Sequence, residues 1–203
     1  MYKVISSGSE GNAILYHNSI LVDCGVSFAA LKPFIYNIQL VLLTHEHKDH
    51  FNLKTIEKLL FERPSLRIGC CNWIDIQGRN IDRYEIGEVY NYGKFSVSPV
   101  KLYHDVPNCG YRIFKDNVKV FHATDTAHLN GIEAKGYDLY ALECNYNEDT
   151  VFESIEKKQL EGKFAYQKGA INSHLSEQQA SDFVFKNKGE NYQFIRLHES
   201  KTV

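Results

Sequence analysis

No long apolar segment occurs in the sequence. None of its apolar runs approaches the roughly 20 residues that an α-helix needs to cross a membrane, so no integral membrane protein is expected. Internal repeats and low-complexity linkers are missing as well. A chain of 203 residues suits one domain with a sizeable core, and we expect a single domain over residues 1–203.

The sequence lacks the signs of a disulfide framework, because its five cysteines show no pairing pattern. An odd count, without a recognisable secretory signal at the start, predicts reduced thiols and a cytoplasmic location. The adjacent Cys70 and Cys71 invite comparison with a metal site. Neighbours on a strand point to opposite faces, however, so buried packing is the favoured interpretation for this pair.

An excess of one charge sign is also missing, because 23 Lys and Arg residues balance 25 Asp and Glu residues to a net charge of −2. Proteins that hold long nucleic acid by bulk electrostatics concentrate Lys and Arg. The balance therefore argues modestly against that mode of binding, although it leaves room for a local basic groove.

What the chain does contain is a dense group of metal-ligand residues, the hexapeptide HEHKDH at positions 45–50, directly after an apolar run. Imidazole suits zinc and similar ions, and a carboxylate can share in a second site. Residues i and i+2 of an extended segment point the same way, so His45 and His47 are placed to bind one ion. Asp49 and His50 project from the following turn toward another. A solvated His-rich loop is the plainer alternative, which this ligand density disfavours.

The remaining pattern predicts a layered sheet protein with helices outside, because polar clusters stand at the ends of apolar strands. Strands are expected at 2–5, 13–16, 20–23, 40–43, 95–102, 111–114, 118–121, 138–142 and 192–197. Helices are expected at 27–35, 53–62, 150–160 and 176–186, the last opened by a capping box of Ser176 and Gln179. The pattern does not distinguish a strand from a loop for the stretch 164–171.

Three further ligand candidates follow apolar strands: His104, Asp125 and His198. With the hexapeptide they make about the number of ligands that two metals need when one carboxylate bridges them. His174 competes with His198 for the last position. The expected set is a first metal on His45, His47 and His104, and a second on Asp49, His50 and His198, with Asp125 between them. The other histidines, His17, His122 and His128, are expected at surface or structural positions.

These residues match a known pattern. The segment 45–50 resembles the HxHxDH signature of the metallo-β-lactamase superfamily, and the segments 6–12, 21–25, 124–126, 142–146 and 172–176 are similar, in order, to its small YycJ-type branch. The resemblance implies an α/β (α+β) fold: a four-layer αββα sandwich of two facing mixed β-sheets with helices outside. It carries the metal-ligand roles onto the same seven residues, and it implies that Asp23 supports the ligand loop without binding metal.

The function that the resemblance implies is a metal-dependent hydrolase, most simply a dinuclear phosphodiesterase that acts on nucleic acid as an exonuclease through a metal-bound hydroxide. Two divalent ions are expected, with zinc favoured over manganese, iron or nickel. Asp49 is the candidate to accept or orient the proton, His174 to donate to the leaving oxygen, and Ser173 and Ser176 to contact phosphate. The expected partner is DNA, RNA or a nucleotide, with no membrane, and a homodimer stays open.

Three other functions remain open at this point: a cyclic-nucleotide phosphodiesterase, a glyoxalase II-like thioesterase and a non-catalytic metal-binding module. The chain also departs from the pattern in two places. The interval between Asp125 and His198 leaves no room for the large inserted domain of some nucleases of the superfamily. His198 is followed by Glu199 and Ser200, whereas the usual His-Leu-Ser sequence occurs here at 174–176.

Overall fold

The computed structural model describes residues 1–161 and 167–200. The chain divides into two compact units, Met1–Glu88 and Val89–Val203. Each unit contains one six-stranded mixed sheet and its own helices. Within the described residues, no helix has the length and apolar character that crossing a membrane requires. The single domain expected over the whole chain stays a prediction.

The sheet of the first unit runs in the order β1-β2-β3-β4-β5-β6. β1 and β2 pair antiparallel, as do β2 and β3, whereas β3 to β6 are all parallel. All four residues of β4 are buried, as expected of a strand covered on both faces. The strands are β1 (Tyr2–Ser6), β2 (Ala13–Tyr16), β3 (Ile20–Val22), β4 (Leu40–Leu43), β5 (Arg67–Cys71) and β6 (Ile81–Tyr84).

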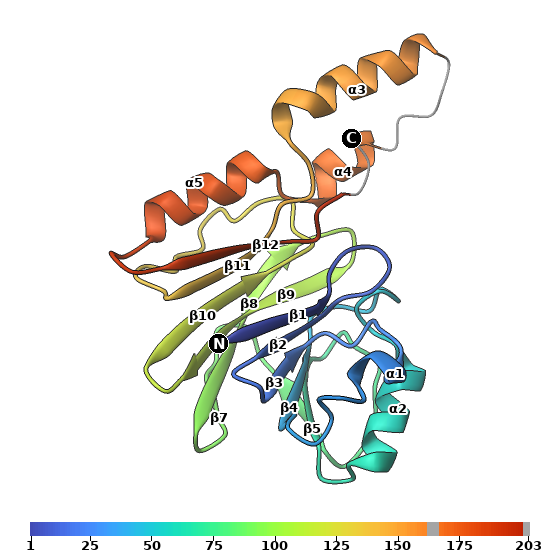
Figure 1. Cartoon of the computed structure of the whole chain (residues 1–203), viewed down its shortest axis with the longest axis vertical. Helices are drawn as coiled ribbons and strands as arrows, with labels where there is room; N and C mark the ends of the chain where they lie inside the picture. The colour runs from blue at the N-terminus through green and yellow to red at the C-terminus, as the bar shows by residue number, and fades with distance from the viewer. Residues whose placement is uncertain (162–166, 201–203) are drawn as a thin grey trace. The chain divides into compact units, whose positions relative to one another are not determined.

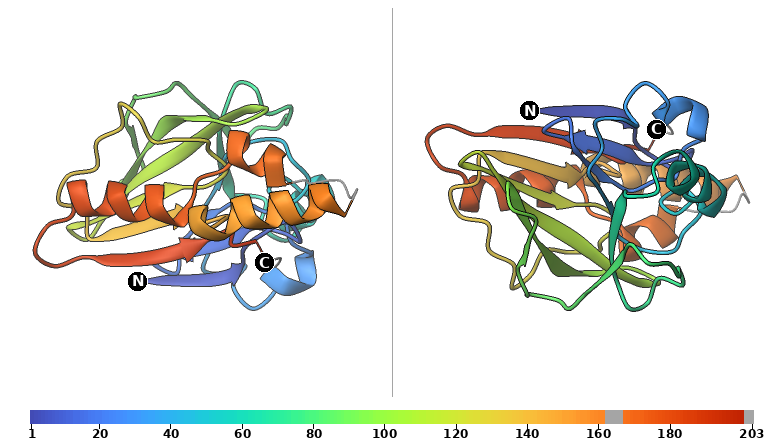
Figure 2. Two further views of the ribbon diagram at one scale, coloured as in Figure 1. Left: turned by 90° about the horizontal axis from the view of Figure 1, so that it is seen from above. Right: turned by 90° about the horizontal axis from the view of Figure 1, so that it is seen from below.

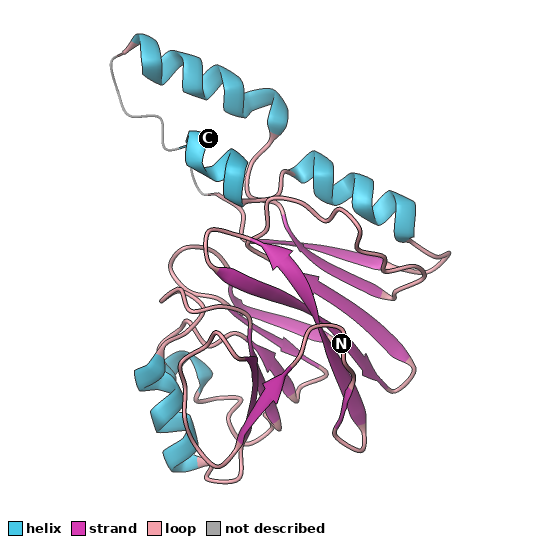
Figure 3. Ribbon diagram, turned by 180° about the vertical axis from the view of Figure 1, so that it is seen from behind, coloured by secondary structure: helices cyan, strands magenta, loops and turns pink. Residues whose placement is uncertain are grey.

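Two helices, α1 (Phe28–Leu31) and α2 (Leu53–Glu62), lie side by side on one face of this sheet (Figures 1 and 3). Asn52 caps α2, because its side chain accepts a hydrogen bond from the backbone N–H of Thr55. The prediction for α2 is confirmed residue for residue. α1 is shorter than the predicted 27–35, since the chain turns after Leu31 and the Pro33 ring cannot supply a backbone donor.

The sheet of the second unit runs in the order β12-β11-β10-β9-β8-β7. β7 to β10 pair antiparallel, and β10, β11 and β12 pair parallel. It follows that β8, β10, β11 and β12 all run in one direction and end at one edge of the sheet. The strands are β7 (Tyr90–Asn91), β8 (Phe95–Tyr103), β9 (Pro107–Lys115), β10 (Val118–Ala123), β11 (Leu139–Glu143) and β12 (Gln193–Leu197).

The described residues of the second unit form three helices: α3 (Glu148–Leu160), α4 (Gln167–Ser173) and α5 (Glu177–Asn187). α5 runs along β11 and β12, whereas α3 and α4 lie beyond the end of that sheet (Figures 1 and 2). The predicted capping box is confirmed: the Ser176 hydroxyl accepts from Gln179 N at 2.9 Å, and the Gln179 side chain accepts from Ser176 N at 2.8 Å.

The sequence pattern missed several elements. β5, β6 and β7 are absent from the predicted strands. β6 mixes two charged residues into four positions and becomes a strand by pairing with β5. In the undecided stretch 164–171, residues 167–171 belong to α4, and 164–166 lie outside the described residues. Cys70 and Cys71 are both buried on β5 and neither forms a disulfide, which confirms the prediction of buried packing.

Candidate metal centre

The predicted ligand loop begins at the carboxyl end of β4. β3 and β4 are parallel, so their carboxyl ends meet at the same edge of the first unit's sheet. Asp23 follows β3, and the loop of residues 44–50 follows β4. His45 and His50 are fully buried in this loop, whereas His47 and Asp49 are half-buried. The loop thus presents two enclosed and two accessible candidate ligand side chains.

Asp23 fixes the protonation of the buried histidines. Its fully buried carboxylate accepts from Thr44 N at 3.0 Å and from the Thr44 hydroxyl at 2.9 Å, and His50 Nδ1 lies 2.7 Å away. Nδ1 of His45 lies 2.9 Å from the same Thr44 hydroxyl. A proton on Nδ1 of each ring satisfies these contacts and puts the lone pair on Nε2, the form that binds a metal. Asp23 thus supports the ligand loop as the resemblance implied.

Asn12 acts on the other nitrogen of His50. The Asn12 side-chain oxygen accepts from Gly8 N at 2.8 Å, which orients the amide so that its nitrogen lies 2.8 Å from His50 Nε2. This N–H requires a lone pair on Nε2, in agreement with the proton that Asp23 requires on Nδ1, and a metal bound to Nε2 would replace this contact. The Asn12 backbone also donates to the Asp49 carbonyl at 2.6 Å. Asn12 therefore attaches the glycine-rich β1–β2 turn to the ligand loop.

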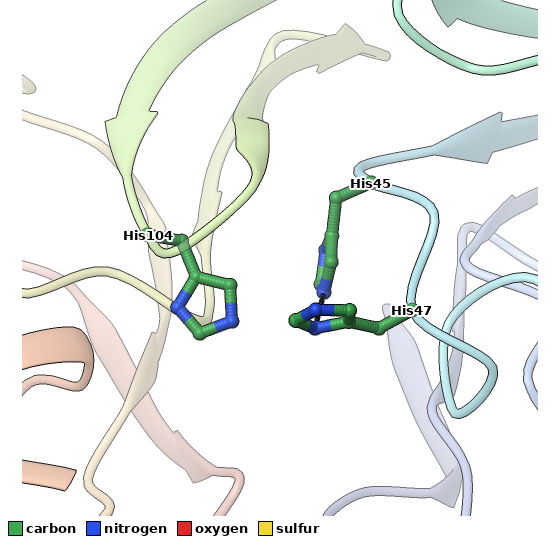
Figure 4. A group of neighbouring side chains, drawn as sticks. All are labelled: His45, His47 and His104. Carbon is green, nitrogen blue, oxygen red and sulfur yellow. Dashed lines mark hydrogen bonds between the residues drawn. The ribbon is translucent and has the colours of Figure 1, made fainter. Parts of the chain in front are cut away.

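His45 and His47 converge as a metal-binding pair. Figure 4 shows them on the loop after β4, with their rings turned toward one another, and it shows His104 on the loop after β8. His45 Nε2 and His47 Nδ1 lie 3.2 Å apart. Two nitrogens bound tetrahedrally to zinc at about 2.0–2.1 Å would be about 3.3 Å apart. The donor set therefore fits zinc or a similar divalent ion.

A second group of ligand residues lies at one edge of the sheet in the second unit. His104 follows β8, Asp125 follows β10, Glu143 ends β11 and His198 follows β12. These four strands run in one direction, so the residues after them are brought to the same edge. Asp125 and His198 have positive φ angles of 57° and 51°, which turn the chain sharply at the point where each strand ends.

Four of the side chains in the second unit form a compact cluster. Ligand atoms of Asp125, Glu143, His174 and His198 all lie within 4.8 Å of one another. His198 Nε2 is 3.3 Å from Asp125 Oδ1, and its Nδ1 is 3.3 Å from Glu143 Oε1. His174 Nδ1 is 2.5 Å from Glu143 Oε1 and 3.6 Å from Asp125 Oδ1. Both competing histidines thus reach Asp125, and His174 is the one paired closely with Glu143.

The acidic neighbours control the charge of His174. Burial lowers the pKa of His174, but the hydrogen bond to Glu143 and the negative charges of Glu143 and Asp125 outweigh burial. The pKa therefore lies above its ordinary value, although the nearby His198 opposes the rise. His174 is still partly exposed, with 18% of its side-chain surface accessible. The ring is held in place while part of it faces solvent.

The other predicted site residues make identifiable contacts. His104 Nδ1 lies 2.9 Å from the Ser173 carbonyl, which favours a proton on Nδ1, and Asp105 approaches Nε2 at 3.0 Å. The Ser173 hydroxyl donates to the Gly169 carbonyl at 3.0 Å. The Ser176 hydroxyl is fully buried as the cap of α5. The structure thus shows scaffold contacts for both serines, and their contact with phosphate stays a prediction.

Sequence reasoning missed Glu143 and Asn12. Glu143 is a fully buried carboxylate that also accepts from the backbone N–H groups of Thr126 and Leu175, each at 3.1 Å. Its signal in the sequence is a carboxylate directly at the end of an apolar strand, the context that singled out Asp125. Asn12 stands in a serine- and glycine-rich turn, and nothing local in the sequence connects it with His50.

Comparison with known proteins identifies the family. A family model described as a β-lactamase superfamily domain matches residues 18–184. Exodeoxyribonuclease YycJ of Bacillus anthracis is 25% identical over 167 residues; the match covers 72% of this chain and 63% of that relative, less than two thirds of its length. A UPF0173 metal-dependent hydrolase of Saccharolobus solfataricus is 26% identical over 218 residues, covering 95% of this chain and 92% of that protein.

Among solved structures, the metallo-β-lactamase fold protein YhfI of Bacillus subtilis matches with a TM-score of 0.74 and 18% identity, over 100% of this chain and 87% of that chain. The fold class expected from the sequence is confirmed by this likeness. The chain belongs to the metallo-β-lactamase superfamily. It is a metal-dependent hydrolase of that superfamily.

Proposed function

We propose that this hydrolase is a dinuclear phosphodiesterase that acts on nucleic acid, in the manner of an exonuclease. The observation that carries the proposal is the buried carboxylate of Asp125 beside His198 Nε2. A carboxylate at this position fits hydrolases of phosphodiesters and thioesters, whereas the lactamases of the superfamily place Cys or His at comparable points. The name of the Bacillus anthracis relative, an exodeoxyribonuclease, supports the phosphodiester choice.

The metal ligands proposed are those expected from the sequence. Their donor chemistry suits zinc, because five imidazoles and two carboxylates make up the set. The divalent ions supply Lewis acidity: they lower the pKa of water and neutralise negative charge on a phosphate. We assign His45, His47 and His104 to the first ion, Asp49, His50 and His198 to the second, and Asp125 to both.

Two residues of the chain move protons in this proposal. Asp49 has 26% of its side-chain surface exposed, so its carboxylate can orient the attacking water and accept its proton. His174 binds Glu143 through Nδ1, which leaves Nε2 to donate a proton to the leaving oxygen. Glu143 keeps the His174 ring protonated and fixed in orientation. The leaving group would otherwise depart as an unprotonated alkoxide.

The test is hydrolysis of bis-p-nitrophenyl phosphate by protein reconstituted with zinc or manganese. Metal-dependent turnover is expected, and Asp49→Ala should lose both turnover and bound metal. His174→Gln should keep both metals yet turn over at least about 100-fold more slowly on a substrate with a poor leaving group. The loss should be smaller with p-nitrophenolate, which departs without a proton. His17→Asn is the matched control, since His17 lies in the β2–β3 turn with a positive φ that asparagine tolerates.

Oligonucleotides, a cyclic nucleotide and a glutathione thioester are then tested as alternative substrates. Release of mononucleotides from DNA or RNA supports an exonuclease, whereas preferential cleavage of a cyclic nucleotide points to the smaller substrate. Turnover of a glutathione thioester without turnover of the phosphodiester contradicts the proposal and favours a thioesterase. Two bound metals with no turnover of any substrate would favour a binding module.

A further inference from the structure

An exposed aromatic pair lies at the edge of the second unit's sheet that carries candidate ligands. Tyr103 is the last residue of β8 and directly precedes His104, and 40% of its surface is exposed. The His128 ring packs against the Tyr103 ring, with centroids 4.2 Å apart and 35° between the ring planes. Lys101, two positions earlier on β8, has its Nζ 5.4 Å from the centroid of the Tyr103 ring. We call Lys101, Tyr103 and His128 the Tyr103 platform.

Thr126 holds the backbones of the two rings together. Its fully buried hydroxyl accepts a hydrogen bond from Tyr103 N at 3.0 Å and donates one to the His128 carbonyl at 2.9 Å. Ala127 N also donates to the Tyr103 carbonyl at 2.7 Å. The rings are therefore positioned before any ligand binds, so a flat ligand that stacks on them has little side-chain entropy to remove.

The Tyr103 platform adjoins two of the candidate metal ligands. His104 follows Tyr103 directly, and consecutive Cα atoms are about 3.8 Å apart. Asp125 directly precedes Thr126, whose hydroxyl binds Tyr103 N. Neighbouring nucleotides of a stacked strand are about 3.4 Å apart along the strand. A strand whose phosphate lies at these ligands therefore has the bases beside that phosphate within reach of the platform.

An exposed ring beside an ammonium group suits a nucleotide. Every base has a flat π-face that stacks on an aromatic side chain, and the ammonium group provides a positive charge for the adjacent phosphate. A cation over an exposed ring is held only weakly. Lys101 can therefore leave the Tyr103 ring for a phosphate when a base stacks there.

We propose that the Tyr103 platform stacks one base of a nucleic-acid strand beside the phosphate that is hydrolysed, while Lys101 binds a neighbouring phosphate. This inference rests on the proposed function and adds to it a substrate class: DNA or RNA strands with an unpaired end. A base inside a duplex stacks on its neighbours and must leave that stack before it contacts Tyr103. Stacking uses the face of a base rather than its edge, so the platform discriminates little among base sequences.

The experiment measures binding of fluorescent single strands of DNA and RNA by anisotropy, with phosphorothioate linkages that slow cleavage by the metal-loaded protein. Each strand carries an abasic residue at one position in turn, which removes one base and keeps every phosphate. Wild type should bind about 5- to 150-fold more weakly when the missing base is the one that stacks. Tyr103→Leu should lose this abasic penalty, Tyr103→Phe should keep it, and Tyr103→Trp should increase it because its ring is larger.

Tyr192 supplies the matched control. It is 38% exposed, with Lys188 Nζ 5.1 Å from its ring centroid and the Tyr140 ring 6.3 Å away, so it resembles the platform in composition. It stands immediately before β12, whereas the candidate ligand His198 follows that strand. Tyr192→Leu should leave the abasic penalty unchanged. Lys101→Met should lower the slope of log K against log salt by about 0.7, and Lys188→Met should not.

The outcomes separate the inference from the proposed function. An abasic penalty that persists in Tyr103→Leu, or equal losses in Tyr103→Leu and Tyr192→Leu, overturns the inference while turnover of bis-p-nitrophenyl phosphate still supports the function. A penalty that depends on Tyr103, in a protein that hydrolyses no phosphodiester, supports the platform and contradicts the function. A blunt duplex that binds as tightly as a single strand overturns the substrate class. Should Tyr103→Leu fail to fold, Tyr103→Trp replaces it, and a penalty no larger than that of wild type overturns the inference.

Discussion

Replacement of Asp23 by asparagine tests the link between the support residue and the metal. Asparagine keeps the size of the side chain, and its oxygen can still accept from Thr44 N. Its other atom becomes an NH2 donor that faces His50 Nδ1, which also carries a proton in the wild type. Two donors then oppose each other across 2.7 Å. A proton on Nε2 would remove this conflict but would face the Asn12 amide N–H, 2.8 Å away. Neither tautomer then satisfies both neighbours, so the His50 ring must shift, which moves Nε2 from its position for binding metal.

The expected magnitudes follow from the hydrogen bonds that the substitution removes. A hydrogen bond to a charged partner contributes about 1.5–3 kcal/mol, and a buried donor left unsatisfied costs about 1–3 kcal/mol. We expect the free energy of unfolding of the metal-free Asp23→Asn protein to fall by about 2–4 kcal/mol. Support residues of this kind change metal affinity by about 10–100-fold. The tautomer conflict should put Asp23→Asn near the 100-fold end of that range for the ion that we assign to His50.

Asp23→Ala provides the matched comparison. Alanine leaves a cavity and no partner for Thr44, so this variant should be the less stable of the two. It does not dictate the His50 tautomer, however, so it should bind metal more tightly than Asp23→Asn. Urea denaturation of metal-free protein measures the stability, and competition with a chromophoric chelator measures the affinity. Equal affinity for Asp23→Asn and wild type, or weaker binding by alanine than by asparagine, would refute the tautomer argument.

Three other predictions concern the scaffold. Gly25→Ala should destabilise the protein by about 3 kcal/mol or more and lower metal occupancy, because the added Cβ would lie 1.7 Å from the Asp49 carbonyl oxygen; chemical denaturation and elemental analysis measure both effects. Ser176→Ala should lower the free energy of unfolding by about 1–2 kcal/mol through removal of the α5 cap, and wild-type stability would contradict that role. Burial raises the pKa of the Cys70 thiol to about 11, against the opposing Arg83 charge. Unfolding therefore releases a proton between about pH 9 and 11, and stability should fall as pH rises through that range, by about 1.4 kcal/mol per unit for this thiol; Cys70→Ala should flatten the slope in denaturation curves.

Short-range sequence patterns predicted the secondary-structure elements that depend only on neighbouring residues. The apolar spacing of residues 53–62 and the capping box of Ser176 each lie within one helix, and both are confirmed. The predicted strands 111–114 and 118–121 are both present, and Asp116 and Asn117 in the turn between them have positive φ. β6 was not predicted, because it becomes a strand by pairing with β5 and its own residues show no strand-like alternation. α1 ended early because turn geometry overrode a weak helical pattern.

The candidate site shows the same division. The identities and spacing of the proposed ligand residues, and their positions after apolar strands, are local features of the sequence. Glu143 was not identified, because its partner His174 stands 31 positions away.

The amino-acid sequence alone specified the ligand chemistry, the superfamily resemblance and the backbone preferences of individual segments, since these depend on residue types and short-range periodicity. The folded arrangement specified which groups orient those ligands. The His50 ring contacts Asp23, which lies 27 positions earlier in the sequence, and Asn12, which lies 38 positions earlier. Together these two contacts fix one tautomer of His50. The cause is the sheet: parallel pairing brings the carboxyl ends of β3 and β4 together, and that pairing depends on register and strand order, which no local pattern encodes.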